Sequence, residues 1–315
     1  MNRKKFILSL GLLFTSASII PSNLAKLVSK GWSNFKHIYT NDRLRNEFLK
    51  FLKNVFNLYP EDDFHQLISD VTAQKTNDRE IYQEAQSKLN AIESTFSIFS
   101  HILPSLFKQK EEMAKQALEL LGNNDKYDGY LEIGSLGRYL DYLEEKVEIT
   151  GNRYYADGKE PSYSITDMVD RGQISIGADY IPMANYKTQY SNLIENESLD
   201  LVTVYIGFHH CPINLRIPFI SSIRNTMRVG GKLILRDHDC NNQDQETIVA
   251  LAHDVFNMGT NETWKYNSDE IRNFYSLDFI CDFVEKIGFK FDKRTLFQEG
   301  DPTKNALMLF TKIEK

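Results

Sequence analysis

The chain has 315 residues, of which 42% are hydrophobic and 25% charged, and its formal net charge at pH 7 is −6. A chain of this length can bury a sizeable core, so the composition predicts a globular protein. The acidic balance and the lack of a basic stripe argue against broad nucleic-acid binding, because nothing would offset phosphate repulsion. RNA binding through a local patch stays open.

The first 25 residues have the pattern of an export signal. A basic stretch over residues 1–5 precedes an apolar run over residues 6–14 and small residues at 15–18, as in bacterial secretory signals. The apolar run is shorter than the roughly 20 residues that span a bilayer. We expect residues 1–25 to direct export or membrane association. The alternative is a cytosolic helix packed on the next domain, in a cytoplasmic protein.

The cysteines favour a different compartment. Cys211, Cys240 and Cys281 are odd in number and have no zinc-like spacing, so we interpret them as free buried thiols. Free thiols fit a reducing compartment better than an oxidising one.

Residues 26–122 are predicted to form an all-helical domain, because apolar residues recur there at steps of three and four. Pro60 ends one helix, the Asn77-Asp78 pair begins another, and Gly122 follows the last. The apolar positions are Leu44, Phe48, Phe51, Leu52, Val55, Phe56, Phe64, Leu67, Ile68, Val71, Ile81, Ala85, Leu89, Ile92, Met113, Ala117, Leu118 and Leu121. We interpret these stripes as packing faces, since no catalytic motif accompanies them.

A strand, a glycine turn and a helical pattern follow over residues 130–140. The strand runs into Glu132, and two glycines three apart, Gly134 and Gly137, form the turn. Such a turn cradles a nucleotide-like ligand, because glycines let the backbone approach it and the helix N-terminus offers unpaired N–H groups. The spacing alone is also common in turns that bind nothing.

Two buried strands further along the chain end in polar residues. The apolar, β-branched stretch 201–207 leads into His209 and His210, and a helical pattern over 217–227 follows. Gly230-Gly231 then stops that helix before a strand that ends in Asp237, His238 and Asp239. The carboxyl ends of parallel strands are where such sheets bind ligands.

In this order and spacing, the chain resembles the class I S-adenosylmethionine-dependent methyltransferases over about residues 125–315. The matching segments are the turn from Glu132 to Gly137, Ala178-Asp179 after the third predicted strand, and the sequences NESLDLV and MRVGGKLIL that lead into the fourth and fifth. The resemblance implies an α/β fold, with a Rossmann-like seven-stranded sheet whose last hairpin is antiparallel. The catalytic domain is then expected over residues 123–315, behind the helical domain. That helical domain could serve as a lid, a substrate-selecting cap or the surface of a homodimer.

The resemblance implies S-adenosyl-L-methionine as the cofactor. Glu132, Gly134 and Gly137 match the motif whose backbone holds the methionine part, although the usual third glycine is missing. Asp179 matches the acid that faces the adenine amino group. Asp157 is the candidate acid for the ribose if the second strand extends that far.

The chemistry is expected at His209, His210, His238 and Asp237. Methyl transfer requires alignment of a nucleophile and removal of its proton, and a histidine can accept that proton at neutral pH. We expect His210 or His238 to be the base and Asp237 to orient it. The acceptor is expected to be a small or medium-sized molecule with a reactive oxygen or nitrogen, on which Trp264 or Tyr275 could stack.

Four alternatives stay open at this point. The strand-end residues, with Asp239, His253 and Asp254, could hold a divalent metal, but family members that bind magnesium there use oxygen ligands, so no metal is predicted. Each histidine could merely satisfy loop backbone. The domain could be a non-catalytic binding or regulatory module at a membrane. Aminopropyl transfer on the same fold would need a carboxylate-lined pocket.

Overall fold

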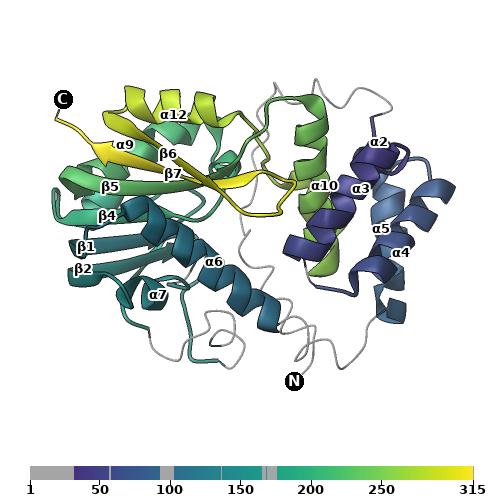
Figure 1. Ribbon diagram of the computed structural model, residues 1–315, viewed down its shortest axis with the longest axis horizontal. Coiled ribbons are helices and arrows are strands. Elements are labelled where there is room, and N and C mark those ends of the chain that lie inside the picture. The colour runs from purple at the N-terminus through teal and green to yellow at the C-terminus, as the bar shows by residue number, and fades with distance from the viewer. Residues whose placement is uncertain are drawn as a thin grey trace.

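The centre of the molecule is a seven-stranded sheet with the strand order β3-β2-β1-β4-β5-β7-β6, shown in Figure 1. The computed structural model describes residues 32–56, 58–92, 103–135, 137–164, 168 and 176–314. The strands are β1 (Lys126–Ile133), β2 (Glu148–Asp157), β3 (Asp179–Pro182), β4 (Leu199–Val204), β5 (Met227–His238), β6 (Phe289–Phe297) and β7 (Asn305–Lys312). All neighbouring strands are parallel except β7, which is antiparallel to both β5 and β6. The expected sheet with an antiparallel last hairpin is therefore confirmed.

Helices precede the sheet and connect its strands. The helical region contains α2 (Asn34–Tyr39), α3 (Asp42–Phe51), the π-helical segment η3 (Leu52–Phe56), α4 (Glu61–Gln74), α5 (Asp78–Ile92) and α6 (Leu103–Leu121). Between and after the strands lie α7 (Leu140–Glu144), η5 (Tyr190–Asn192), η6 (Phe208–His210), η7 (Ile213–Leu215), α9 (Arg216–Thr226), α10 (Gln243–Gly259), α11 (Trp264–Asp269) and α12 (Leu277–Lys286). The predicted export signal lies outside the described residues. Within them, no helix has the length and apolar character needed to cross a bilayer.

Both faces of the sheet are buried, because successive side chains of a strand point to opposite sides. In β5, Leu233 and Leu235 join the apolar cluster that includes α9 and α12. The intervening Ile234 joins the cluster on the other face, with residues of α6 and α7. This double cover explains the nearly continuous apolar runs of β4 and β5. The cysteines are buried and free, as expected.

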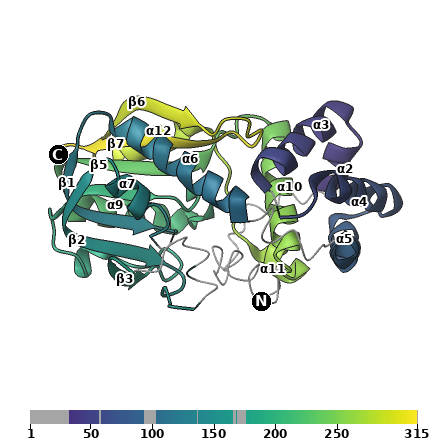
Figure 2. The ribbon, with the colours of Figure 1, turned by 60° about the horizontal axis from the view of Figure 1, so that its bottom comes forward.

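The helix α10 belongs to two neighbourhoods. Figures 1 and 2 show it between the sheet and the bundle formed by α2, α3, α4 and α5. Five of its residues lie in one apolar cluster with buried residues of that bundle: Ile248, Leu251, Ala252, Val255 and Met258. By contrast, α6 contributes Met113, Ala117, Leu120 and Leu121 to the core on the sheet. The domain boundaries at residues 25 and 122 stay a prediction.

Two details differ from the sequence prediction. The pair Gly230-Gly231 does not end α9, which already ends at Thr226; it lies inside β5, where the pairing of β4 and β5 shifts register. Gly230 has a φ of 85°, which a glycine adopts readily in a bulge. In addition, α7 has only five residues, so its N-terminus offers a weaker dipole than the pattern suggested.

The carboxyl group of Asp78, in the helical bundle, should make the free energy of unfolding depend on pH. It accepts hydrogen bonds from the Ser33 hydroxyl and the Asn34 N–H group. Burial, followed by repulsion from Asp254, raises its pKa to about 6. The unfolded chain loses this proton near pH 4, so the folded state is stabilised below that pH and loses the stabilisation as the pH rises through 6.

The variant Asp78→Asn cannot ionise at this position. Between pH 4 and pH 7, we expect the free energy of unfolding of the wild type to fall, relative to that of the variant, by up to about 3 kcal/mol. Urea unfolding at the two pH values measures the difference. Parallel pH profiles of the two proteins would contradict the prediction.

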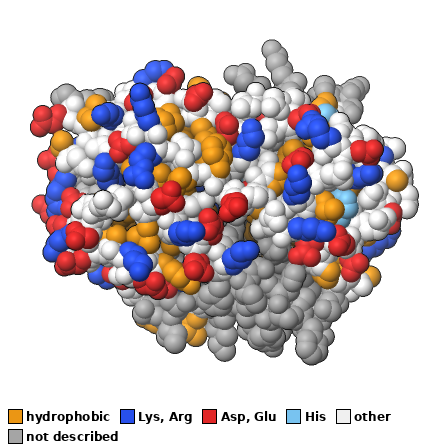
Figure 3. Space-filling model, viewed as in Figure 1, with side chains coloured by type: hydrophobic (Ala, Val, Ile, Leu, Met, Phe, Trp, Pro, Cys, Tyr) orange, Lys and Arg blue, Asp and Glu red, His pale blue; other side chains and the backbone are white. Residues whose placement is uncertain are grey.

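The face of the molecule seen in Figure 3 carries Lys, Arg, Asp and Glu side chains interspersed with one another. No stripe of one charge sign runs across this view.

Candidate functional site

The glycine turn after β1 is built around a buried acid. Tyr130 donates its hydroxyl to Glu132 Oε2 at 2.9 Å, and the Ser135 hydroxyl donates to Oε1. Burial raises the pKa of Glu132, while hydrogen bonds from Ser135, Tyr130 and the Tyr139 N–H group act to lower it. This carboxyl group therefore fixes both sides of the turn, because its acceptors hold the strand before it and the residues after it.

Glycine is required at both positions of the turn. Gly134 and Gly137 have φ values of 82° and 75°. A Cβ at Gly134 would lie 2.4 Å from the Cβ of Ile206, and one at Gly137 would lie 2.1 Å from the Tyr155 ring. The turn can therefore approach β2 and the end of β4 only because it has no side chains there.

Asp157 lies next to this turn. The strand β2 does extend to Asp157, its last residue, so the condition set on this candidate is met. The preceding Ala156 pairs with Ile133 of β1, and its carbonyl accepts the Gly134 N–H group at 2.7 Å. The Asp157 side chain is buried. A buried acid thus stands at the carboxyl end of β2, beside the glycine turn.

The position expected for Asp179 is wrong. Asp179 is the first residue of β3, is exposed and pairs with Tyr154. The carboxyl end of β3 is Pro182, which pairs with Asp157. The two ends of β3 are about 10 Å apart at the usual rise per residue. Asp179 therefore lies at the amino end of β3, three residues before the ligand-binding edge of the sheet and not at that edge.

His209 and Asp237 form a buried pair across the ends of β4 and β5. His209 lies in the short turn η6, and its Nδ1 is 2.7 Å from Asp237 Oδ1. Asp237 Oδ2 also accepts the His209 N–H group at 2.9 Å, and Oδ1 accepts the His238 N–H group at 2.7 Å. Burial raises the pKa of Asp237, while His238 and these hydrogen bonds act to lower it. Asp237 thus orients His209, whereas we expected it to orient His210 or His238.

Close packing holds the His209 ring in place. A Cβ at Gly207 would lie 2.2 Å from His209 Cε1. Only glycine at that position leaves room for the ring.

His210 and His238 are oriented by backbone carbonyls. His210 Nδ1 is 2.9 Å from the Ile271 carbonyl oxygen, and His238 Nδ1 is 3.0 Å from that of Thr303. Because a carbonyl can only accept, Nδ1 carries the proton in each ring and the lone pair is on Nε2. Burial, followed by the neighbouring His209, lowers the pKa of both rings well below the usual histidine value. Both are therefore neutral at pH 7.

A fourth histidine, His253 of α10, joins these three. The His209 ring centroid lies 4.1 Å from that of His210, 5.0 Å from that of His253 and 5.4 Å from that of His238. We call these four residues the histidine cluster. From the sequence, His253 was a candidate only within the metal alternative. Of the other residues in that alternative, Asp239 accepts the Leu277 N–H group and Asp254 pairs with Arg272.

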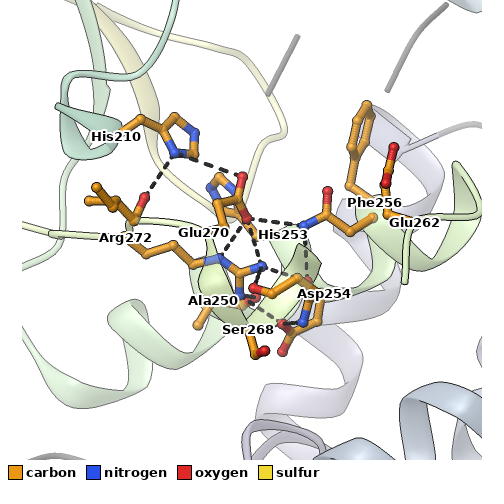
Figure 4. A network of polar contacts seen from close by, with 12 residues as sticks. His210, Ala250, His253, Asp254, Phe256, Glu262, Ser268, Glu270 and Arg272 are labelled. Atoms are coloured by element: carbon orange, nitrogen blue, oxygen red, sulfur yellow. Dashed lines mark hydrogen bonds and ion pairs between the residues drawn. The ribbon is translucent and has the colours of Figure 1, made fainter. Parts of the chain in front are cut away.

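Glu270 and Arg272 support the histidine cluster, and sequence analysis missed both. Figure 4 shows Glu270 between His210, His253 and Arg272. Its carboxyl oxygens are 3.8 Å from His210 Nδ1, 3.6 Å from His253 Nδ1 and 2.7 Å from Arg272 Nη2. Burial acts to raise the pKa of Glu270, but Arg272 and the two imidazoles outweigh it, so the pKa lies well below its usual range. In the sequence, Glu270 and Arg272 stand out only as part of a polar segment after α11, and that segment carries no motif.

The sheet decides the fold. Its strand order, its antiparallel last hairpin and the glycine turn after β1 are those of the class I methyltransferases. The chain has the class I methyltransferase fold. The buried Asp157 and the histidine cluster both lie at the edge of this sheet where its parallel strands end, which is the ligand-binding edge of such sheets.

No family model and no curated protein matches the chain. Solved structures of methyltransferases do resemble it. The 1,6-didemethyltoxoflavin-N1-methyltransferase of Burkholderia thailandensis, with 1,6-didemethyltoxoflavin and S-adenosylhomocysteine bound, is 10% identical, with a TM-score of 0.42 over 65% of this chain and 79% of that one. A SAM-dependent methyltransferase from Aquifex aeolicus is 14% identical, with a TM-score of 0.42 over 67% of this chain and 98% of that one. Because these scores are low, the fold assignment rests on the sheet topology.

Proposed function

We propose that this chain is an S-adenosylmethionine-dependent methyltransferase that acts on an oxygen or nitrogen of a small or medium-sized acceptor. The observation that carries the proposal is the pairing of two features along one sheet edge. A buried acid and a glycine turn stand at the ends of β2 and β1. The histidine cluster stands at the ends of the neighbouring β4 and β5.

The residues at the ends of β1 and β2 suit the binding of the methyl donor, S-adenosylmethionine. We expect Asp157 to accept hydrogen bonds from the two ribose hydroxyls and the backbone of the adjacent turn of Gly134 and Gly137 to hold the methionine part. Glu132 keeps that backbone in place through Tyr130 and Ser135. When bound, the donor supplies an electrophilic methyl group on a positively charged sulfur.

The histidine cluster suits a role in removing the proton of the methyl acceptor. We assign His238 as the base, because its ring is neutral, its Nε2 carries a lone pair, and it is less enclosed than His209 and His210. As the acceptor atom bonds to the methyl carbon and the carbon–sulfur bond breaks, the acceptor proton passes to His238 Nε2. Asp237 positions His238 through its N–H group and also holds His209.

Two measurements on the purified full chain test the proposal. Isothermal titration with S-adenosylhomocysteine should show one site per chain, and transfer of a labelled methyl group should be detectable with a panel of hydroxyl and amine acceptors. No binding would remove the basis of the proposal. Binding without turnover on a broad panel would favour a non-catalytic binding or regulatory module instead.

A further inference from the structure

Three histidines of the cluster are arranged like a set of metal ligands. One ring nitrogen each of His209, His210 and His253 lies within 4.8 Å of the others. Their side chains are 2%, 6% and 10% exposed. Ligands of a tetrahedral zinc ion lie about 3.3 Å apart, from zinc–nitrogen distances of about 2.0 Å. The separations of the three nitrogens therefore exceed those of a zinc site by about 1.5 Å at most.

Two of these rings make the outer hydrogen bonds of metal-ligating histidines, and the third has a carboxylate on the same side. Such histidines donate one ring N–H group to a carboxylate or a backbone carbonyl, which fixes the lone pair on the other nitrogen. His209 has Asp237 in that position and His210 has the Ile271 carbonyl. His253 Nδ1 faces Glu270 Oε2 at 3.6 Å.

Two buried atoms in and beside the histidine cluster are hydrogen-bond acceptors that receive no hydrogen bond from the residues that the structure describes. His209 Nε2 is buried and lacks a hydrogen-bond partner among the residues that the structure describes, and so does Glu270 Oε1. The lone pair on His209 Nε2 follows from the bond that Nδ1 makes to Asp237. Leaving such acceptors unsatisfied is costly. A bound cation would satisfy His209 directly, and the negative charge of Glu270 and Asp237 would favour it.

We propose that His209, His210 and His253 bind one divalent transition-metal ion of the zinc type. Asp237, the Ile271 carbonyl and Glu270 orient the three rings. Three imidazole ligands suit zinc or cobalt(II) and disfavour magnesium, which prefers oxygen ligands. His238 is not among the three ligands and keeps its lone pair for the acceptor proton. The metal site does not depend on the proposed function, because it is defined by ring geometry alone.

The experiment is a metal titration of the full chain after removal of metal with a chelator. We expect one zinc ion bound per chain, one cobalt(II) ion with the absorption spectrum of a tetrahedral nitrogen-ligated site, and no comparable binding of magnesium. The ligand variant is His253→Asn, because the asparagine amide takes the place of Nδ1 and Nε2 is lost. Its matched control is His65→Asn in α4, outside the histidine cluster.

His253→Asn should weaken zinc binding more than about 100-fold, and Glu270→Gln should weaken it about 10-fold to 100-fold. His65→Asn should bind zinc as the wild type does. Absence of zinc binding in the wild type, or equal affinity in the wild type and His253→Asn, would overturn the site. If His253→Asn does not fold, Glu270→Gln and the cobalt(II) spectrum decide the same question. Titration of the metal-free protein with S-adenosylhomocysteine tests the proposed function separately from the metal site. The residues proposed to bind the methyl donor lie at the ends of β1 and β2, away from the three metal ligands.

Discussion

Replacing Asp157 with alanine is expected to weaken binding of S-adenosylhomocysteine about 100-fold. Asp157 ends β2 as a buried acid beside the glycine turn. A hydrogen bond to a charged group contributes about 1.5–3 kcal/mol, so loss of two ribose contacts at the lower end of that range, about 3 kcal/mol in all, corresponds to a change of this size. Isothermal titration measures it, and Asp157→Asn, which keeps one acceptor oxygen, should show a smaller loss.

Asp179→Ala is the matched control for this prediction. Asp179 is an exposed acid at the amino end of β3, so its removal should leave affinity for S-adenosylhomocysteine unchanged. An equal loss in both variants would mean that the ligand lies elsewhere. An unchanged affinity in Asp157→Ala would show that Asp157 does not contact it.

Replacing His238 with asparagine is expected to lower kcat by about 10²- to 10⁴-fold, the usual contribution of a general base. The asparagine amide can take the place of Nδ1 and keep the hydrogen bond to the Thr303 carbonyl. The variant therefore loses Nε2 alone, and affinity for S-adenosylhomocysteine should not change. Single-turnover assays with an acceptor identified in the panel measure the effect.

Two comparisons make this result specific to His238. His65→Asn removes a histidine of α4 and should leave kcat at the wild-type value. Wild-type kcat in His238→Asn, together with a large loss in His210→Asn, would contradict our assignment of the base to His238.

The sequence predicted the sheet because each of its long strands carries a local signal. The β-branched run of β4 and the repeated apolar residues of β5 are buried on both faces, and such strands need no knowledge of their neighbours to be recognised. By contrast, β3 has four residues and is defined by its pairing with β2. Asp179 was misplaced for that reason, because pairing leaves no periodic pattern in so short a segment.

The same limit applied to the site. Neighbouring parallel strands end together, so the meeting of His209, Asp237 and His238 could be predicted. Which imidazole contacts Asp237 could not, because it depends on the turn η6 and on the close packing of the His209 ring against Gly207. Glu270 and Arg272 reach the histidine cluster from a segment about 60 residues beyond His210, and no local pattern encodes such a contact.

The double role of α10 has a consequence for how the chain acquires its structure during synthesis. The bundle of α2, α3, α4 and α5 leaves the ribosome first, yet the apolar face that closes its core lies on α10, which follows β5. Until most of the sheet has been translated, these early helices expose apolar surface to water. A growing chain in that condition is prone to aggregate or to recruit chaperones.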